Sequence, residues 1–338
     1  MTSHKTILVL GATGSIGGEA ARAFLRRGWT VRGLRRSLGS SPEGLERVEW
    51  IKGDVMNPAD VLSAARGADV IFHGVNPPAY RGWAKVVLPM IDSTIEAAAA
   101  TGARIAFPGT VYNYGPDVFP LVGPDAPQNA RTRKGKIRVE MERRMEQAQA
   151  RGVKTLIVRA GDFFSPHKVN SWLSNGMIRP GKPLKSVTYP GRADAGHAWA
   201  FLPDLGETFA RLLERDAELA PFERFHFGGH YFPRGIAMAE AVRRAAGNDT
   251  LPIRPLPWFA IVALSPFVET FREMLEMRYL WKTSLEMDNR KLVAFLGAEP
   301  HTPTQVAMTQ TLEGLGCLPA SKSGAASVSQ PRQSRPAW

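Results

Sequence analysis

Hydroxyl side chains gather in one short stretch of the chain, PGTVYNYG, at residues 108–115. Thr110, Tyr112 and Tyr114 directly follow the apolar run RIAF, so they lie where a buried strand is expected to end. A hydroxyl group in such a position can hold or transfer the proton of a reacting alcohol. The same stretch also fits an ordinary aromatic turn, and the choice depends on what the rest of the chain builds around it.

A glycine-rich turn, GATGSIGG, lies near the start of the chain between an apolar run and a helical pattern. Gly11 permits a tight turn, Gly14 lets the backbone approach a pyrophosphate, and Gly17 allows close packing of a helix on a sheet. The free N–H groups at Ser15 and Ile16 would then hold phosphates, helped by the helix dipole. This turn predicts a dinucleotide site, and a purely structural glycine turn is the weaker alternative.

The end of the second apolar run bears on which dinucleotide is bound. An NAD site usually carries Asp or Glu there, to bind the ribose 2′-hydroxyl. This sequence reads GLRRS, with Arg35 and Arg36 in that place. Arginine suits a 2′-phosphate because it makes paired, charge-assisted hydrogen bonds. NADP(H) is therefore the predicted cofactor, with NAD(H) second.

Short apolar runs and helical patterns alternate along the first half of the chain. Strands are expected at residues 6–10, 30–34, 48–54, 68–75, 104–109 and 154–161. Helices are expected at 15–27, after Asn57, before Gly102, and at 134–150. Such alternation predicts an α/β fold with a doubly wound, Rossmann-type parallel sheet and helices on both faces.

The alternation stops after residue 162, where glycine and proline become frequent. Residues 1–162 are therefore assigned to an NAD(P)-binding domain, which the helical segment 202–216 is expected to rejoin. Residues 163–318 are expected to be mainly a smaller substrate-binding region. Residues 319–338 have the composition of a disordered tail.

Composition indicates a globular protein, with 44% hydrophobic and 22% charged residues among 338. The longest apolar stretch, WFAIVAL at 258–264, is too short to cross a bilayer, and no signal peptide is expected. Cys317 is the single cysteine, which excludes a disulfide framework and a cysteine metal site. We expect a cytoplasmic protein that does not bind membranes.

The formal net charge of +12 favours an anionic ligand or a solvated basic surface. Residues 131–144 hold seven basic and two acidic residues, and the tail 319–338 holds three basic residues and no acid. Aromatic residues are not interleaved with these charges, and no nucleic-acid module is recognised. We expect a small-molecule substrate, with an anionic one as a candidate, and no nucleic-acid partner.

Several stretches resemble the extended, epimerase/dehydratase-like branch of the short-chain dehydrogenase/reductase superfamily. They are GATGSIGG (11–18), GDVMNP (53–58), VIFHGVN (70–76), TVYNYG (110–115), KIRVE (136–140) and VRAGDFF (158–164), and the resemblance covers about residues 5–317. It implies a substrate between the sheet's carboxyl edge and the C-terminal region. It also implies a dimer contact on the helices around 89–101 and 136–150.

The resemblance assigns cofactor contacts beyond the glycines and arginines. Asp54 would bind the adenine amino group, with Val55 beside it. The other expected contacts are Thr13 in the glycine turn, His73, Gly74, Val75 and Asn76 along the adenine and ribose, and Ala160, Gly161, Asp162 and Phe163 near the nicotinamide. Arg159 and Asp162 are expected to form a structural ion pair. His197 is expected to be a hydrogen-bonded loop residue near the substrate, and no metal site is expected.

The family uses a serine or threonine together with a tyrosine four residues before a lysine. The tyrosine transfers the proton, and the lysine lowers the tyrosine pKa and binds the nicotinamide ribose. Matching the motifs puts Thr110 at the hydroxyl position and Lys136 at the lysine. The tyrosine should then be residue 132, which is a threonine.

Three explanations follow from this missing tyrosine. Tyr112 could replace it from the same strand end, or Lys136 or Lys134 could carry the proton. Alternatively, hydride chemistry is lost and the chain is a non-catalytic NADP(H)-binding redox sensor or regulatory protein. The main expectation is an NADP(H)-dependent oxidoreductase or epimerase/dehydratase-like enzyme acting on a small carbonyl or alcohol compound or a nucleotide-sugar-like substrate.

Overall fold

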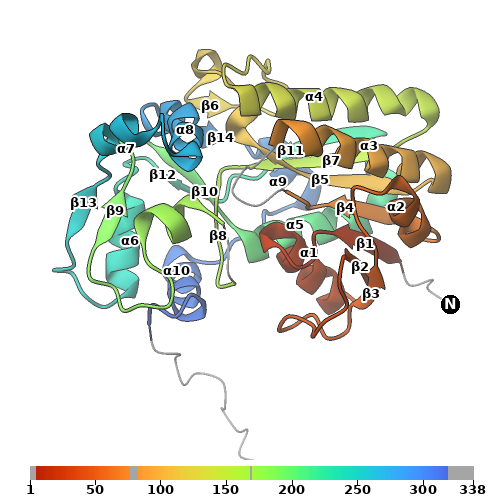
Figure 1. The fold of residues 1–338 in the computed structure, drawn as a ribbon, viewed down its shortest axis with the longest axis horizontal. Coiled ribbons are helices and arrows are strands. Elements are labelled where there is room, and N and C mark those ends of the chain that lie inside the picture. Colours follow the sequence, from red (N-terminus) through yellow and green to blue (C-terminus); the bar gives the residue numbers. More distant parts are fainter. Residues whose placement is uncertain (1–4, 77–82, 168–169, 319–338) are drawn as a thin grey trace, which may run out of the picture.

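Seven parallel strands form the central sheet of the chain (Figure 1). A computed structural model describes residues 5–76, 83–167 and 170–318. The strands lie in the order β11-β7-β5-β4-β1-β2-β3. Their bounds are β1 (Thr6–Leu10), β2 (Thr30–Arg35), β3 (Glu49–Lys52), β4 (Val70–His73), β5 (Arg104–Thr110), β7 (Thr155–Ala160) and β11 (Phe222–His226). The short apolar runs become strands because both of their faces are covered by helices.

Two groups of helices cover the two faces of this sheet. The first group is α1 (Ser15–Arg26) and α5 (Leu202–Glu214), and the second is α2 (Pro58–Ala65), α3 (Trp83–Thr101) and α4 (Arg133–Gln147). On the first face Phe72 of β4 meets Phe209 of α5, with ring centroids 5.0 Å apart. The predicted doubly wound, Rossmann-type α/β fold is thus confirmed.

The central sheet has one strand more than the sequence predicts. Six strands were expected, whereas β11 pairs with β7 as a seventh, beginning at Phe222 opposite Thr155. The segment FERFH does not read as a buried run because β11 is an edge strand whose first three residues are half-buried. Helix α9 (Arg290–Leu296) also packs near it, with Phe225 and Phe295 rings 5.4 Å apart. Parts of residues 163–318 therefore complete the sheet domain.

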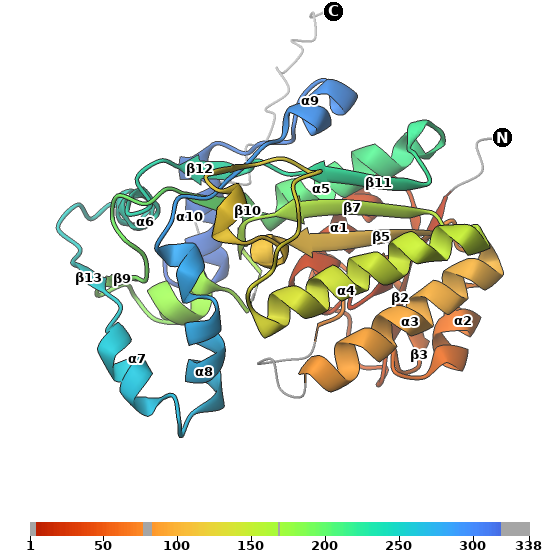
Figure 2. The ribbon, with the colours of Figure 1, turned by 90° about the horizontal axis from the view of Figure 1, so that it is seen from above.

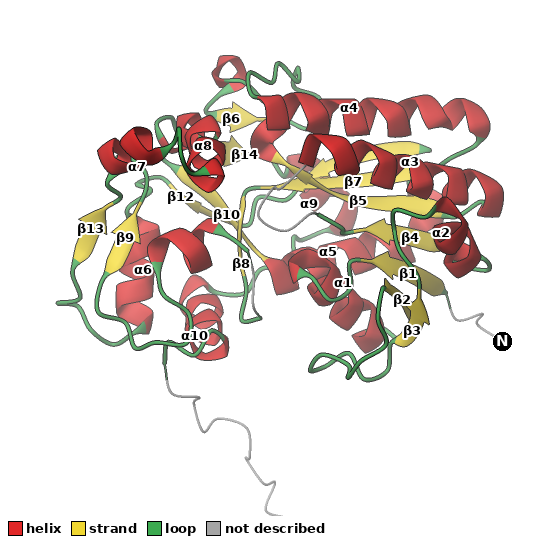
Figure 3. Ribbon diagram, viewed as in Figure 1, coloured by secondary structure: helices red, strands yellow, loops and turns green. Residues whose placement is uncertain are grey.

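The remaining residues form a second lobe of small sheets and helices (Figure 3). Its sheets are β12-β10-β8, β13-β9 and β14-β6. The strands are β6 (Leu121–Val122), β8 (Asp162–Phe164), β9 (Val187–Tyr189), β10 (His197–Phe201), β12 (His230–Phe232), β13 (Ile253–Pro255) and β14 (Glu286–Met287), and the helices are α6 (Ala237–Ala245), α7 (Trp258–Leu264), α8 (Glu269–Glu276) and α10 (Thr304–Gly314). Figure 2 shows α7 and α8 projecting together at the edge of this lobe.

The two lobes meet where β7 continues into β8. A Cβ on Gly161 would lie 2.1 Å from the backbone oxygen of Ala198 in β10, so only glycine fits between these strands. The second lobe thereby starts at the carboxyl end of the central sheet. In the described part of the chain, no helix is long and apolar enough to span a membrane.

Candidate functional site

The glycine turn between β1 and α1 is packed so closely that side chains cannot enter. Gly11 has φ +87°, and a Cβ there would lie 2.8 Å from the backbone of Gly74. A Cβ on Gly17 would lie 2.2 Å from the carbonyl oxygen of Gly11. The Gly14 amide donates to that same oxygen at 2.8 Å, which closes the turn. Glycine at these positions is therefore a steric requirement of the fold.

The start of helix α1 lies at the point where the strand order reverses. Strand β1 pairs with β2 on one side and with β4 on the other, so connections leave in both directions from this point. Ligands of doubly wound sheets bind at this crevice. Thr13 and Gly14 are exposed at the tip of the turn, and the first turn of α1 contains no acidic residue. The backbone N–H groups there suit an anion.

The two arginines at the end of β2 differ in their contacts and in their exposure. The guanidinium of Arg35 lies 4.2 Å from the ring centroid of Trp50 and donates to the carbonyl oxygens of Gly39 and Ser40. Arg36 is exposed. Leu34 of β2 pairs with Leu10 of β1, which places both arginines one strand away from the glycine turn.

The ends of β3 and β4 carry the residues expected along the adenine and ribose. Asp54 Oδ1 accepts from the Met56 amide at 3.0 Å, so this carboxylate shapes the turn in which Val55 is half-buried. Asn76 is exposed, and its Oδ1 accepts from the indole nitrogen of Trp83 at 2.6 Å.

His73 is buried at the end of β4, and its Nδ1 lies 2.8 Å from Thr94 Oγ1. Burial, together with the nearby charge of Arg138, lowers the pKa of His73 to about 3. His73 is therefore a neutral structural residue that supports the strand end, and Gly74 beside it fits against Gly17.

Thr110 lies at the end of β5 beside the end of β7. Its register partner is Ala160, so the central sheet brings the expected hydroxyl residue next to the segment 160–163. Thr110 Oγ1 accepts from the Tyr112 amide at 3.3 Å and begins a short 3-10 helix, η2 (Val111–Asn113). Tyr112 is half-buried against an apolar cluster that includes Val111 and Met277. Phe163 is half-buried, whereas Phe164 belongs to the core.

Helix α4 faces the sheet with different residues from those that the sequence predicts. Thr132 is its N-cap, and its Oγ1 accepts from the Gly135 amide at 3.0 Å. Lys136 is exposed. The inward positions spaced four apart are Lys134, Arg138 and Glu142. Because the helix starts at residue 133, Lys136 lies on its exposed side, and the expected role of Lys136 as the family's lysine stays a prediction.

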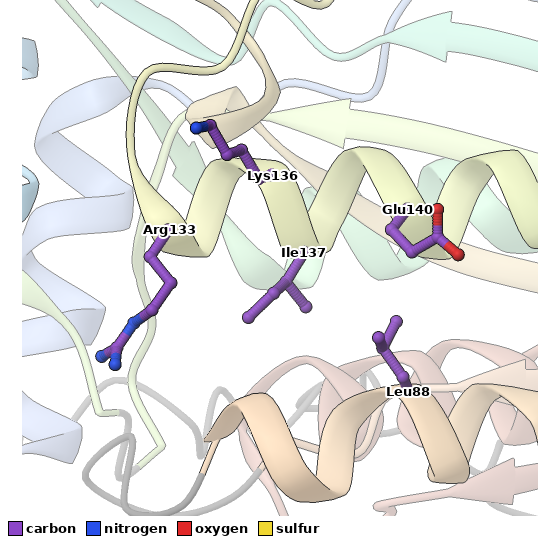
Figure 4. A pocket seen from close by; sticks show the side chains of 5 residues that line it. All are labelled: Leu88, Arg133, Lys136, Ile137 and Glu140. Atoms are coloured by element: carbon purple, nitrogen blue, oxygen red, sulfur yellow. The ribbon is translucent and has the colours of Figure 1, made fainter.

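Lys136 lies at the edge of a pocket of about 390 Å³ between α3 and α4. In Figure 4 its side chain points away from the groove, into which Ile137 projects opposite Leu88. Arg133 and Glu140 also line this pocket. The expected dimer contact lies on the same two helices, and that assembly stays a prediction.

Arg138 occupies the space beneath the ends of β4 and β5. Its guanidinium carbon lies 5.5 Å from the ring centroids of both Trp83 and Phe107. Trp83 in turn binds Asn76, so the arginine is joined to the strand end where the cofactor ribose is expected. Arg138 was not among the residues expected at the site, although it lies four residues after Lys134 and so on the same side of the helix.

Lys134 is buried and paired with helix α8. Its ammonium lies 2.6 Å from Glu273 Oε2, and its backbone amide donates to Glu276 Oε1 at 2.9 Å. Burial lowers the pKa of Lys134, while Glu273 acts in the opposite direction. The two carboxylates lie near the N-terminus of α4, where the positive end of the helix dipole stabilises negative charge. These contacts join the second lobe to the sheet domain.

A buried polar network holds the ends of β5, β7 and β11 together. Arg159 pairs with Glu142 of α4 and donates to the Tyr114 hydroxyl at 2.7 Å. That hydroxyl lies 2.8 Å from His226 Nε2, and His226 Nδ1 lies 2.8 Å from the Val122 carbonyl oxygen. Burial raises the pKa of Tyr114 to about 12, and burial with Arg159 lowers that of His226 to about 3. These groups are structural.

The expected ion pair between Arg159 and Asp162 is wrong, because Arg159 turns to Glu142. Asp162 Oδ2 instead lies 2.7 Å from His197 Nε2. The His197 ring stacks on Trp281, with centroids 4.1 Å apart and planes inclined by 9°. The parallel pairing of β8 with β10 brings the two residues together, and a sequence pattern could not show that pairing. In the described residues, no group of three or more His, Cys, Asp or Glu could hold a metal ion.

Comparisons with known proteins agree with this architecture. Residues 7–228 match the NAD dependent epimerase/dehydratase family. No curated protein matches the chain in sequence. The chain therefore belongs to the NAD dependent epimerase/dehydratase family, which assigns it to the NAD(P)-dependent enzymes and agrees with the resemblance to extended short-chain dehydrogenases/reductases.

Solved structures with a similar fold include sugar-nucleotide epimerases. One is the UDP-glucose 4-epimerase of Bifidobacterium longum in complex with NAD⁺ and UDP, with TM-score 0.70, 16% identity, and 93% of this chain and 98% of that chain covered. Another is the UDP-glucose 4-epimerase of Stenotrophomonas maltophila with bound NAD and formylated UDP-arabinopyranose, with TM-score 0.72, 14% identity, and 92% and 98% covered. The Bordetella bronchiseptica enzyme WbmH, in complex with NAD⁺, has TM-score 0.65, 18% identity, and 92% and 98% covered. At these identities the likeness is one of fold.

Proposed function

We propose that this chain is an NADP(H)-dependent oxidoreductase or epimerase/dehydratase-like enzyme that works without the tyrosine of its family. Its substrate is a small carbonyl or alcohol compound or a nucleotide-sugar-like molecule. The observation that carries this proposal is the meeting of three features at one sheet edge. They are the closed glycine turn at Gly11, the strand end at Thr110 and the inward cation Arg138.

The residues at the switch point fit a dinucleotide. Side chains at Gly11 and Gly17 would collide with backbone, so the turn keeps its amides open to a pyrophosphate. In the proposal Thr13 to Ile16 bind the pyrophosphate, Asp54 and Val55 the adenine, Gly74 to Asn76 the ribose side, and Ala160 to Phe163 the nicotinamide side. The cofactor, when bound, supplies hydride transfer at the nicotinamide C4.

The preference for NADP(H) rests on Arg35 and Arg36. The neighbouring structures contain NAD, so this preference is a property proposed for this chain alone. Arg35 is fixed by the carbonyl oxygens of Gly39 and Ser40 and by Trp50, which reduces the entropy cost of binding a phosphate there. Exposed Arg36 adds a second positive charge.

The proton chemistry is assigned to Thr110 and Tyr112. An arginine stays protonated at any ordinary pH, so Arg138 binds ribose hydroxyls and stabilises nearby negative charge but transfers no proton. Thr110 hydrogen-bonds the reacting oxygen, and Tyr112, two residues further, gives or accepts its proton. Lys134 is excluded from this role because it is held by Glu273.

A second candidate function is an NADP(H)-binding sensor without turnover. The observation in its favour is Lys134, which occupies the first inward position of α4 and is committed to Glu273 and Glu276. A side chain locked there stabilises the lobe contact instead of reaching a substrate. Turnover measurements distinguish the two candidates.

The test measures NADPH oxidation on a panel of aldehydes and ketones and conversion of a panel of UDP-sugars. We expect turnover on one class, lowered about 100-fold by Tyr112→Phe or Thr110→Ala. Arg138→Ala should weaken NADPH binding about tenfold, whereas Lys136→Ala, on the outer face of the same helix, should leave it unchanged. Stoichiometric NADPH binding with no turnover on either panel would establish the sensor instead.

A further inference from the structure

The hairpin of α7 and α8 carries the most exposed apolar surface of the described chain. Phe259 is 82% exposed and Phe267 is 84% exposed. Val262, Leu264 and Val268 complete the group, so five of the ten exposed large apolar side chains in the described residues lie here. A contiguous apolar patch of this kind marks an interaction surface.

The sequence of the hairpin has no charge over residues 255–268, PLPWFAIVALSPFV. Helix α7 buries Ile261 against the protein and exposes Phe259 and Val262 on its other sides. Its seven residues span about 10 Å. A short apolar helix of this kind can lie in the plane of a bilayer interface with its apolar side buried about 5–10 Å deep.

A basic pocket of about 280 Å³ lies at the base of the hairpin. Arg192, Arg278 and Lys282 line it together with the indoles of Trp258 and Trp281. The Arg278 guanidinium carbon lies 4.9 Å from the ring centroid of Trp258, which holds this cation at the pocket. An anion with several oxygen acceptors suits the cationic side chains that line it.

On the outer part of the hairpin, basic residues outnumber acidic ones. Residues 254–282 contain Arg254, Arg272, Arg278 and Lys282, against three glutamates. Glu273 and Glu276 are turned to Lys134, which leaves Glu269 as the one acid on the outer part of the hairpin. An anionic surface is therefore the complementary partner.

We propose that the α7–α8 hairpin docks this protein onto an anionic phospholipid surface. Phe259 and Phe267 enter the acyl boundary, and the pocket of Arg278 and Lys282 binds a headgroup phosphate. The hairpin lies in the interface and does not cross the bilayer, in agreement with the shortness of its apolar run. A second copy of the chain would bring the same basic pocket and the same sign of charge, so it fits this surface less well.

The experiment is flotation of the full chain with vesicles of phosphatidylcholine alone or with added phosphatidylglycerol. We expect binding that requires phosphatidylglycerol and weakens with salt. Phe259→Ser with Phe267→Ser should reduce binding at least about tenfold. Arg278→Gln with Lys282→Gln should remove the preference for phosphatidylglycerol. The control Val306→Ser changes another exposed apolar residue, on α10, and should leave binding unchanged.

Four outcomes would overturn the proposal that the hairpin docks onto an anionic phospholipid surface. Absence of binding to both vesicles does so directly, and equal loss in Val306→Ser shows that binding is not specific to the hairpin. A dimer in solution that Phe259→Ser with Phe267→Ser dissociates, without vesicle binding, assigns the surface to a second copy. Binding of soluble glycerol phosphate without vesicle binding assigns the pocket to a free phosphate. Circular dichroism and NADPH binding verify that each variant is folded.

Discussion

At the scale of single residues, charge burial separates structural groups from candidate catalytic ones. Arg159 is fully buried, and its charge is balanced by Glu142, which also accepts hydrogen bonds from Asn113 and Gln128. A buried ion pair of this kind adds little net stability over an apolar pair. Removing one partner, however, strongly destabilises the protein because the other charge stays buried without a counter-charge. Tyr114 belongs to this network, because its side chain is fully buried and its hydroxyl is held by Arg159 and His226.

Glu142→Gln should therefore destabilise the protein strongly. It leaves the guanidinium of Arg159 buried without a counter-charge, and we expect the free energy of unfolding to fall by about 3–5 kcal/mol. The measurement is chemical denaturation followed by circular dichroism. Glu140→Gln is the matched control, because Glu140 of the same helix pairs with the partly exposed side chains of Arg143 and Arg144 and its loss should cost less than about 1 kcal/mol. Equal losses would show that the buried network is not a stability element.

The sequence indicates where a strand ends more reliably than which side of a helix faces the sheet. Thr110 lies where the strand pattern predicts it, because a strand end is fixed by a run of apolar residues. Along α4, by contrast, Lys134, Lys136 and Arg138 are all basic, so composition cannot show which of them faces the sheet. Only the helix start, capped by Thr132, determines that phase.

At the scale of elements, the contact between β1, α1 and β4 positions the whole cofactor site. Gly17 of α1 lies against Gly11, and Gly11 lies against Gly74 after β4. We expect a side chain at either Gly11 or Gly17 to displace the helix whose amides are proposed to bind the pyrophosphate. The affinity for the cofactor and the packing of α1 are thus both expected to depend on the contact between Gly17 and Gly11.

Gly17→Ala should lower NADPH affinity at least about tenfold, because the added methyl group would meet the Gly11 carbonyl and push α1 away from β1. Gly18→Ala, at the next position, meets Ala12 O and Arg22 Nη1 at 3.2 Å and gains helix propensity. It should retain nearly the full affinity. Titration of both variants, with thermal unfolding to compare stability, is the measurement. Similar affinities for the two variants would remove the steric argument.

The inner strands of the central sheet could be predicted because both of their faces are buried, which makes them largely continuous apolar runs. Edge strand β11 and the short strands β6, β8, β12 and β14 lack such runs. Their partners are distant in sequence, as when Asp162 of β8 meets His197 of β10. The position of the second lobe over the sheet edge could therefore not be predicted from the sequence.

At the scale of the whole molecule, the site and the apolar hairpin are separate features of the two lobes. The sheet domain supplies the glycine turn, the arginines after β2 and Thr110. The second lobe closes over the sheet edge through Gly161 and through the contact of Lys134 with Glu273. Within the proposed function, the site binds NADP(H) and uses Arg35 and Arg36 to select it over NAD(H).

Calorimetric titration of the full chain with NADPH and NADH measures this selectivity. We expect at least about tenfold tighter binding of NADPH, since hydrogen bonds between arginine and a 2′-phosphate are charge-assisted. Arg35→Ala with Arg36→Ala should remove this difference and leave NADH binding nearly unchanged. Equal affinities for the two cofactors in the unmodified protein, or tighter binding of NADH, would contradict it.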